Sequence, residues 1–341
     1  MDVRLSPEQE ALRSSATQIV DRLAPRAVGQ IGDPERLAKL VAAVDESGWR
    51  ELRSEADDGG SLATGVEPAV VAEELGRGLA DVSFLGPTLA TELRRLAGAG
   101  PGDAAETVAL DTGLRSLARA VDDASPAAVA VDVQGSTRAL LLVRDDKRHR
   151  LAQVELRAAP AGLDLTRPTV VLDQSCAVVP VDDARPITDE DLARWTALGL
   201  ALTCADLVGV MRGAVALATT YATQRRQYGA AIGSFQAVQH MLADAFVLAE
   251  GSRSVTLHAA WAVDALPAGE ALTASAMAKA YCARAAIDVC ETAIQVHGGI
   301  GNTWECLAHV YLRRSLLSGD ILGNAGTSLS QVLVGHGLAA P

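Results

Sequence analysis

The sequence from Gln224 to Asp244 is QRRQYGAAIGSFQAVQHMLAD, and it lies between two long stretches of helical pattern. An arginine pair and two glycines interrupt the apolar spacing in its first half, whereas the spacing resumes after Phe235. We therefore expect one helix to end near Gln224 and a second to begin near residue 234.

Long helices are predicted on both sides of this stretch. The upstream helix is expected to begin at Thr188, which can cap it, with Asp191 in the place of a capping-box acid. A glycine pair, Gly298-Gly299, marks the end of a third helix. The expected C-terminal helices span residues 188–224, 234–264, 270–296, 303–316 and 324–335.

Short runs rich in valine and leucine precede these helices, and Gly, Asp, Lys or Pro separates them. This pattern is typical of strands, so we expect a small β domain. The predicted strands are 107–110, 127–133, 139–143, 151–156, 169–172 and 176–181.

The first hundred residues again have helical spacing. Ser6 can cap the first helix, and Pro7 stands at its first position. Helices are expected over 6–28, 34–47 and 66–79, and the segment 88–98 closes this region. The fold class is therefore mainly α with a small β domain. The predicted domains are an N-terminal helical domain (1–104), a reduced middle β domain (105–185) and a C-terminal helical bundle (186–341).

Composition limits the possible partners and compartments. The net charge of −12 disfavours nucleic acid and anionic membranes. The five cysteines form no C-x-x-C pair, so no metal site is expected, and free thiols suit a reducing cytoplasm. The start MDVRLSPEQE has no apolar signal region, and the most apolar window, 195–211, contains Asp206 and is short for a membrane span.

Several residues near the opening stretch have the chemistry of a dinucleotide site. The planar fork of Arg225 suits a pyrophosphate, although an arginine pair at a helix end is often only solvated. Gln236 offers a donor and an acceptor to an adenine or ribose, or it is an ordinary surface glutamine. Tyr228 and Phe235 either flank an adenine or belong to the core. Gly298 permits close backbone approach, or it only caps a helix.

Two motifs resemble the acyl-CoA dehydrogenase family. Residues 224–244 are similar to its pattern R-x-x-F-G-x-x-I-x-x-F-Q-x-x-x-x-x-L-A-D, and Gln295-Val-His-Gly-Gly-Ile-Gly301 is similar to its pattern Q-x-x-G-G-x-G. Weaker matches are Gly48-Trp49, Glu73-Glu-Leu-Gly-Arg77 and Leu163-Asp-Leu-Thr-Arg167. The resemblance extends along the whole chain, thinly in the β domain.

This resemblance implies FAD as cofactor and an acyl-CoA as substrate, with electron-transferring flavoprotein as a possible acceptor. In the family, these motifs hold the adenine and pyrophosphate end of an FAD that is bound mainly to a neighbouring subunit. The residues that the resemblance implicates in cofactor binding are Arg225, Tyr228, Phe235, Gln236, Gln295, Gly298 and Gly299.

The sequence departs from the family where the chemistry should occur. The T-E-P-x-x-G-S-D and G-x-K-x-x-I-T-N stretches of the β domain are both missing. The family's Y-E-G-T turn, which often carries the catalytic glutamate, corresponds to Asp320–Thr327, which has no glutamate. Other members place the base near what is Gly199 here. Asp206 and Asp320 are the nearest acids, and we expect neither to be a base, so the catalytic residue stays unknown.

The combination resembles the short subunit of bacterial heteromeric (α2β2) acyl-CoA dehydrogenases, which often act on bulky thioesters such as steroid side chains. It implies a heterotetramer with a longer family member that supplies the base. The alternatives are a self-sufficient homo-oligomeric dehydrogenase with a divergent base and a scaffold that has lost FAD. A di-iron bundle is disfavoured because Glu305 and His309 are four residues apart and have no second pair.

Overall fold

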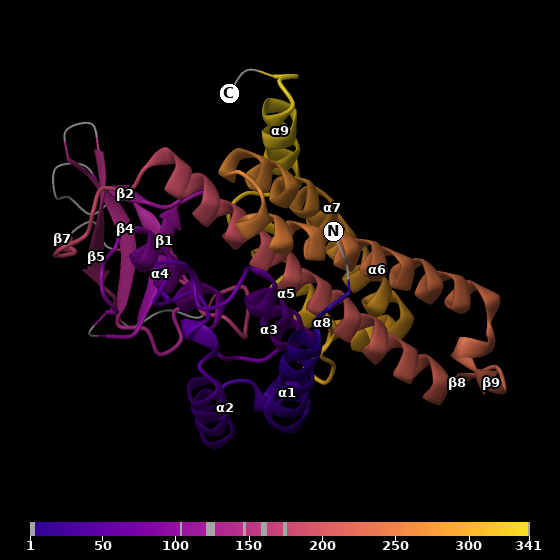
Figure 1. The fold of residues 1–341 in the computed structure, drawn as a ribbon. Helices are drawn as coiled ribbons and strands as arrows, with labels where there is room; N and C mark the ends of the chain where they lie inside the picture. Colours follow the sequence, from indigo (N-terminus) through magenta and orange to yellow (C-terminus); the bar gives the residue numbers. More distant parts are fainter. Residues whose placement is uncertain are drawn as a thin grey trace.

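The structure is a computed structural model that describes residues 4–102, 104–120, 127–145, 148–157, 162–172 and 176–339. Helices come first along the chain, strands follow, and helices return to the end (Figure 1). The expected fold class, mainly helical with a small sheet, is confirmed. The domain boundaries near residues 104 and 185 stay predictions.

The N-terminal region contains four α-helices in its described residues: α1 (Pro7–Leu23), α2 (Pro34–Glu46), α3 (Val66–Arg77) and α4 (Leu85–Leu96). Short 3-10 turns, η1 (Val28–Gln30) and η2 (Trp49–Glu51), connect the first three. Ser6 caps α1 as predicted, through a complete capping box with Gln9. The predicted end of α1 at residue 28 was wrong, because Pro25 disfavours helical backbone at the residue before it.

The strands form one sheet in the order β6-β3-β1-β4-β5-β7, with β2 paired to β4. Strand β1 is parallel to β4 and antiparallel to β3, so that Val108 is paired with both Leu140 and Val131. The two-residue strand β2 was not predicted. The bounds are β1 (Glu106–Asp111), β2 (Arg119–Ala120), β3 (Ala128–Val131), β4 (Arg138–Asp145), β5 (Arg148–Glu155), β6 (Val170–Val171) and β7 (Val179–Pro180).

Both faces of the sheet are buried. Alternation along a strand sends successive side chains to opposite faces. Val108 and Leu140 join the large core shared with the helices, whereas Ala109, Ala139 and Leu141 belong to a second, smaller core. The near-continuous apolar pattern of β1 and β4 follows from this two-sided burial.

The C-terminal region is a bundle of long helices, with α5, α6 and α7 side by side (Figure 1). Helix α5 begins as predicted, because Thr188 and Asp191 form a complete capping box. The bounds are α5 (Asp189–Gln224), β8 (Arg226–Gln227), β9 (Ala230–Ala231), η3 (Ile232–Ser234), α6 (Gln236–Ala265), α7 (Ala268–His297), η4 (Gly298–Asn302), α8 (Ala308–Asp320) and α9 (Ala325–Gly335).

Helix α5 is the central helix of the molecule, and it packs against α3, α4, α6, α7 and α8. By length and composition it could cross a membrane, but 78% of its apolar window is buried against the other elements, as expected of a core helix. Gly209 lets α3 approach closely, because a Cβ there would collide with the Glu73 carbonyl oxygen. The sheet lies toward one end of α5, and the β8–β9 hairpin lies at the other (Figure 1).

Candidate functional site

The residues implicated in cofactor binding begin where α5 ends. Arg225 is the C-cap of α5, and its backbone N–H donates to the Tyr221 carbonyl at 2.8 Å. The chain then turns through the β8–β9 hairpin, with Tyr228 in left-handed backbone at φ 53°. Within the described part of the chain, the exposed Arg225 guanidinium has no acceptor, whereas Arg226 donates to the Gly229 carbonyl at 3.1 Å. Arg225 therefore has free donors for an anion.

Two aromatic rings stand beside this arginine on the surface. Tyr228 and Phe235 meet edge to face, with ring centroids 6.4 Å apart. Tyr228 is 96% exposed and Phe235 is 39% exposed, so the alternative that these rings belong to the core is wrong. Gln236 follows as the first residue of α6 and is exposed as well.

The second motif lies at the end of α7. Gln295 is in the last turn of α7 and is exposed. Gly298 ends the helix with φ 64°, a conformation that favours glycine, and Gly299 lies in the following turn η4. Both glycines have open space where a side chain would begin, so a ligand could approach the backbone here.

A ring stack that was not anticipated joins the two motifs. Tyr221, in the last turn of α5, stacks on His297, the last residue of α7, with ring centroids 4.4 Å apart. His297 also hydrogen-bonds the Ala293 carbonyl at 2.7 Å through Nδ1. The stack brings the Arg225 segment and the Gly298 segment to the same end of the bundle. The sequence carries no signal for it, because the two rings belong to separate helices.

Together these seven implicated residues form an open half-site on one end of the bundle. A free guanidinium, two exposed rings, exposed amides and accessible backbone fit the adenine and pyrophosphate end of a dinucleotide. All seven are exposed, so this chain does not enclose the ligand with them.

The turn that corresponds to the family's Y-E-G-T turn lies next to Gly199, near which other members place the base. Gly199 on α5 packs against Leu322 in the turn after α8, and a Cβ added to Gly199 would meet the Leu322 Cδ1 atom. The same Cβ would lie 3.5 Å from both Cδ atoms of Leu89 on α4. Leu322 and Leu89 are buried, at 6% and 0% exposure. Apolar side chains therefore fill this point, and neither position carries a carboxylate.

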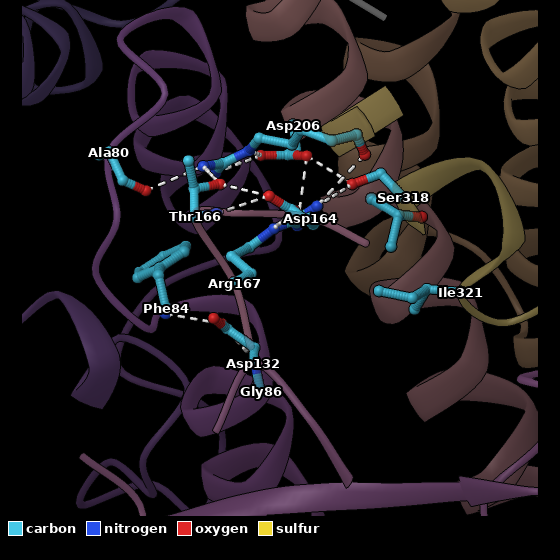
Figure 2. Close-up of polar contacts among 12 residues, drawn as sticks. Ala80, Phe84, Gly86, Asp132, Asp164, Thr166, Arg167, Asp206, Ser318 and Ile321 are labelled. Carbon is cyan, nitrogen blue, oxygen red and sulfur yellow. Dashed lines mark hydrogen bonds and ion pairs between the residues drawn. The ribbon is translucent and has the colours of Figure 1, made fainter. Parts of the chain in front are cut away.

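Asp206, one of the two nearest acids, belongs to a buried ion-pair network (Figure 2). Arg314 donates to its Oδ1 from Nη2 at 2.7 Å, and the Ser318 hydroxyl donates to its Oδ2 at 2.6 Å. Arg167 lies 3.3 Å from the same Oδ2. Burial alone would raise the pKa of Asp206, but the charges of Arg167 and Arg314 outweigh it and lower this pKa below the usual value. An anion held this firmly is a poor proton acceptor, and Asp206 is an interior polar group as expected.

The same network explains the motif around Arg167. Asp164 accepts from Arg167 Nε at 3.0 Å, and the Thr166 hydroxyl accepts from Arg314 Nη1 at 3.0 Å (Figure 2). The cavity beside Asp206 holds only about 10 Å³, room for about one water molecule. The segment between the sheet and α5 is therefore tied to α8 by charge and hydrogen bonds, with no space there for a thioester.

Asp320, the other acid, is exposed at the end of α8, where its carbonyl accepts from the Gly323 N–H at 2.9 Å.

A buried lysine supports the turn that follows. Lys279 on α7 donates to the Ile321 carbonyl at 2.8 Å and to the Thr203 hydroxyl at 3.2 Å. Burial lowers the pKa of Lys279 to about 8. Sequence reasoning did not single out Lys279, because one lysine in an alanine-rich helix carries no signal of burial.

The described residues contain no cluster of three or more His, Cys, Asp or Glu side chains that could hold a metal ion. Most of the exposed large apolar residues belong to the C-terminal helices and their connections. They are Tyr228, Phe235, Phe246, Val247, Met277, Tyr281, Ile300, Trp304, Leu316, Leu329, Leu333 and Leu338. Single exposed apolar residues are ordinary, whereas a contiguous patch of them is typical of a contact surface.

Comparison with known proteins agrees with the resemblance noted from the motifs. The family model described as acyl-CoA dehydrogenase, C-terminal domain, matches residues 197–332. Acyl-CoA dehydrogenase IpdE2 from Mycobacterium tuberculosis is 30% identical over 335 residues, covering 92% of this chain and 93% of the relative.

Two solved structures share the fold over nearly the whole chain. One is the Tcur3481-Tcur3483 steroid ACAD G363A variant, with a TM-score of 0.78, 22% identity and coverage of 98% of this chain and 99% of that one. The other is the ChsE4-ChsE5 complex from Mycobacterium tuberculosis, with a TM-score of 0.74, 22% identity and coverage of 100% of both chains.

Proposed function

Because this chain belongs to the acyl-CoA dehydrogenase family of FAD-dependent oxidoreductases, we propose that it is the base-less subunit of a heteromeric dehydrogenase. One observation carries the proposal: Gly199 packs against Leu322, which lies in the turn that corresponds to the family's Y-E-G-T turn, and neither residue has a carboxylate. α,β-Dehydrogenation of a thioester requires a carboxylate within hydrogen-bond reach of the α proton. This chain has none at that point, so a partner must supply it.

The open half-site around Arg225 has the features needed to complete the partner's FAD site. The Arg225 guanidinium would grip the pyrophosphate with charge-assisted bonds. The exposed rings of Tyr228 and Phe235 would flank the adenine, and Gln236 would pair with the adenine or ribose. Gln295, Gly298 and Gly299 would let the chain approach the same end of the cofactor. FAD bound in the completed site would accept the hydride that leaves the β carbon.

The proposed partner is a longer family member in a heterotetramer. The apolar residues exposed along the C-terminal helices provide a surface that a partner would cover. Two of the structures with this fold carry paired names, Tcur3481-Tcur3483 and ChsE4-ChsE5, and the second is described as a complex. These pairings favour a heteromeric assembly over a homo-oligomer.

We infer an acyl-CoA with a bulky acyl group as the substrate class. One structural neighbour is a steroid ACAD variant, and the relative of 30% identity belongs to the same family, which supports this substrate class. Electrons would pass from the flavin to electron-transferring flavoprotein, as is usual in the family. All five cysteines are free, which suits a cytoplasmic protein.

Turnover measurements test the proposal. The purified chain, assayed alone with added FAD and a series of acyl-CoA thioesters, should show no oxidation of any of them. After co-expression with a longer family member, the purified complex should reduce its flavin when an acyl-CoA is added. Steady oxidation of an acyl-CoA by the chain alone would instead support the self-sufficient alternative. A complex that forms but never contains flavin would support the scaffold.

A further inference from the structure

A large cleft lies on the other side of α4 from α5. It has a volume of about 950 Å³ and is bounded by α2, η2, α4, residues 99–102 and 104–106, and the turn at 134–136. On α4, Leu89 faces Gly199 and the core, whereas Ala90 and Thr91 line the cleft. The described lining contains no residue beyond 136, so this α2–α4 cleft is separate from the half-site around Arg225.

Ion pairs and hydrogen bonds tie both ends of α2 to the segment that leads into α4. At its start, Arg36 pairs with Asp81 and donates to the Leu23 carbonyl at 2.8 Å. At its end, Asp45 pairs with Arg50, which also donates to the Ser83 carbonyl at 2.9 Å. Helix α2 lies at the outer edge of the molecule (Figure 1). Helix α2, which forms one wall of the cleft, is therefore held in place by ion pairs, and not by side chains that pack across the cleft.

The wall formed by residues 99–102 and 104–106 is also fixed by an ion pair and a hydrogen bond. Arg94 on α4 donates to both carboxylate oxygens of Glu106, at 2.5 and 2.6 Å, and to the Gly100 carbonyl at 3.0 Å. A bidentate pair of this kind sets orientation as well as distance. A cleft with two fixed walls is preorganised, which lowers the entropic cost of binding a ligand.

The charges of the lining exclude an anionic ligand. Its described arginines are already engaged: Arg50 with Asp45, Arg94 with Glu106, and Arg95 with Glu92 at 2.8 and 2.9 Å. Two further carboxylates, Glu51 and Glu55, also line the cleft. A carboxylate or phosphate entering here would lose its water without gaining a free cation.

The remaining lining is apolar with a few uncharged polar groups. Leu37 and Val41 line the cleft from α2, and Pro87 lines it from α4. Thr91 and Gln134 add a hydroxyl and an amide that could pair with a hydroxyl or carbonyl of a ligand. The volume is within the range of about 300–1,000 Å³ typical of small-molecule sites. We propose that the α2–α4 cleft binds a neutral, largely apolar small molecule, independently of the FAD half-site.

Fluorescence of the neutral dye Nile red tests this proposal on the whole chain, together with any subunit that co-purifies. The variant Ala38→Trp would fill the cleft from α2, and Thr91→Phe would fill it from α4. Ala42→Trp is the matched control, because Ala42 is exposed on the same helix but does not line the cleft. We expect both filling variants to lower the dye affinity by on the order of tenfold and the control to leave it unchanged.

Competition by a matched pair of probes tests the ligand class. Dodecanol should displace the dye from the wild-type protein, whereas dodecanoate should be at least about tenfold weaker, because its carboxylate finds no free cation. Equal dye binding by wild type, Ala38→Trp and Thr91→Phe would overturn the site. Equal displacement by the alcohol and the carboxylate would overturn the assignment to neutral ligands.

Discussion

Gly199 on α5 and Leu322 in the turn after α8 are in direct contact, although they lie in separate helical segments of the chain. Gly199 is near one place at which members of this family carry the catalytic base, and Leu322 lies in the turn that corresponds to the other. In this chain the first position has no side chain and the second has a buried apolar one. The contact therefore explains how the turn closes against α5, and neither residue supplies a carboxylate there.

Replacing Gly199 by alanine should destabilise the protein. The added Cβ would collide with Leu322, and overpacking of this kind costs about 1–3 kcal/mol. Gly269→Ala is the matched control, since that glycine lies in the first turn of α7 with nothing within 4 Å of an added Cβ. The free energy of unfolding in urea should fall for Gly199→Ala and not for Gly269→Ala. Equal midpoints for the two variants would show that the contact is not tight.

Replacing Asp206 by asparagine should destabilise the protein, whereas replacing Asp320 should not, and neither replacement should change the rate of catalysis. Asp206→Asn leaves the buried Arg167 and Arg314 without their shared carboxylate, which should cost about 3–5 kcal/mol of stability. Asp320→Asn changes an exposed residue and should be nearly silent. Turnover per bound flavin in the folded complex should stay near wild type for both. A loss of about 10²–10⁴ with flavin intact would identify a base after all.

The stability supplied by Asp206 should depend on pH in a definite direction. Its pKa is lower in the folded protein, so the unfolded state binds the extra proton as pH falls. The stabilisation is therefore complete above the unfolded pKa of about 3.9 and is lost as pH drops through the folded value. The difference in unfolding free energy between wild type and Asp206→Asn should be constant from pH 5 to 7. It should shrink progressively below about pH 4, and a difference that grew there would contradict the ion pairs.

Alanine variants of Arg225 and of its neighbour Arg226 test whether Arg225 contacts the cofactor, with Arg226 as the control. Arg225→Ala should lower the flavin content of the complex, because a charge-assisted bond worth about 1.5–3 kcal/mol is lost. Arg226→Ala should not, since that side chain is already bonded to the Gly229 carbonyl within its own hairpin. Flavin absorbance per protein measures both. Full flavin occupancy in Arg225→Ala would show that Arg225 does not contact the cofactor.

Elements with strong local signals were predicted well from sequence. Helix α5 begins and ends where its capping box and the following arginine pair indicated. Helix α8 begins at Ala308 rather than near residue 303, because the turn η4 continues the chain from the glycine pair first. The start of helix α4 at Leu85 was not predicted, because Asp132, which follows β3, accepts from the Phe84 and Gly86 N–H groups (Figure 2). No local pattern can predict a cap that comes from another element.

The candidate site was predictable only in part, for the same reason. The motifs identified Arg225, Gln236 and Gly298 by residue type and spacing. Their common location depends on the stack of Tyr221 on His297, which is a tertiary contact. The buried partners of Asp206 and Lys279 come from helices distant in sequence, so only the folded chain reveals them.

Flavin stoichiometry measured together with native mass tests the central claim most directly. Two samples are compared: the chain expressed alone, and the chain co-expressed with a longer family member. The account predicts a flavin-poor or unstable protein in the first sample and a yellow heterotetramer in the second. One FAD per protomer in a pure homotetramer that oxidises an acyl-CoA would contradict it.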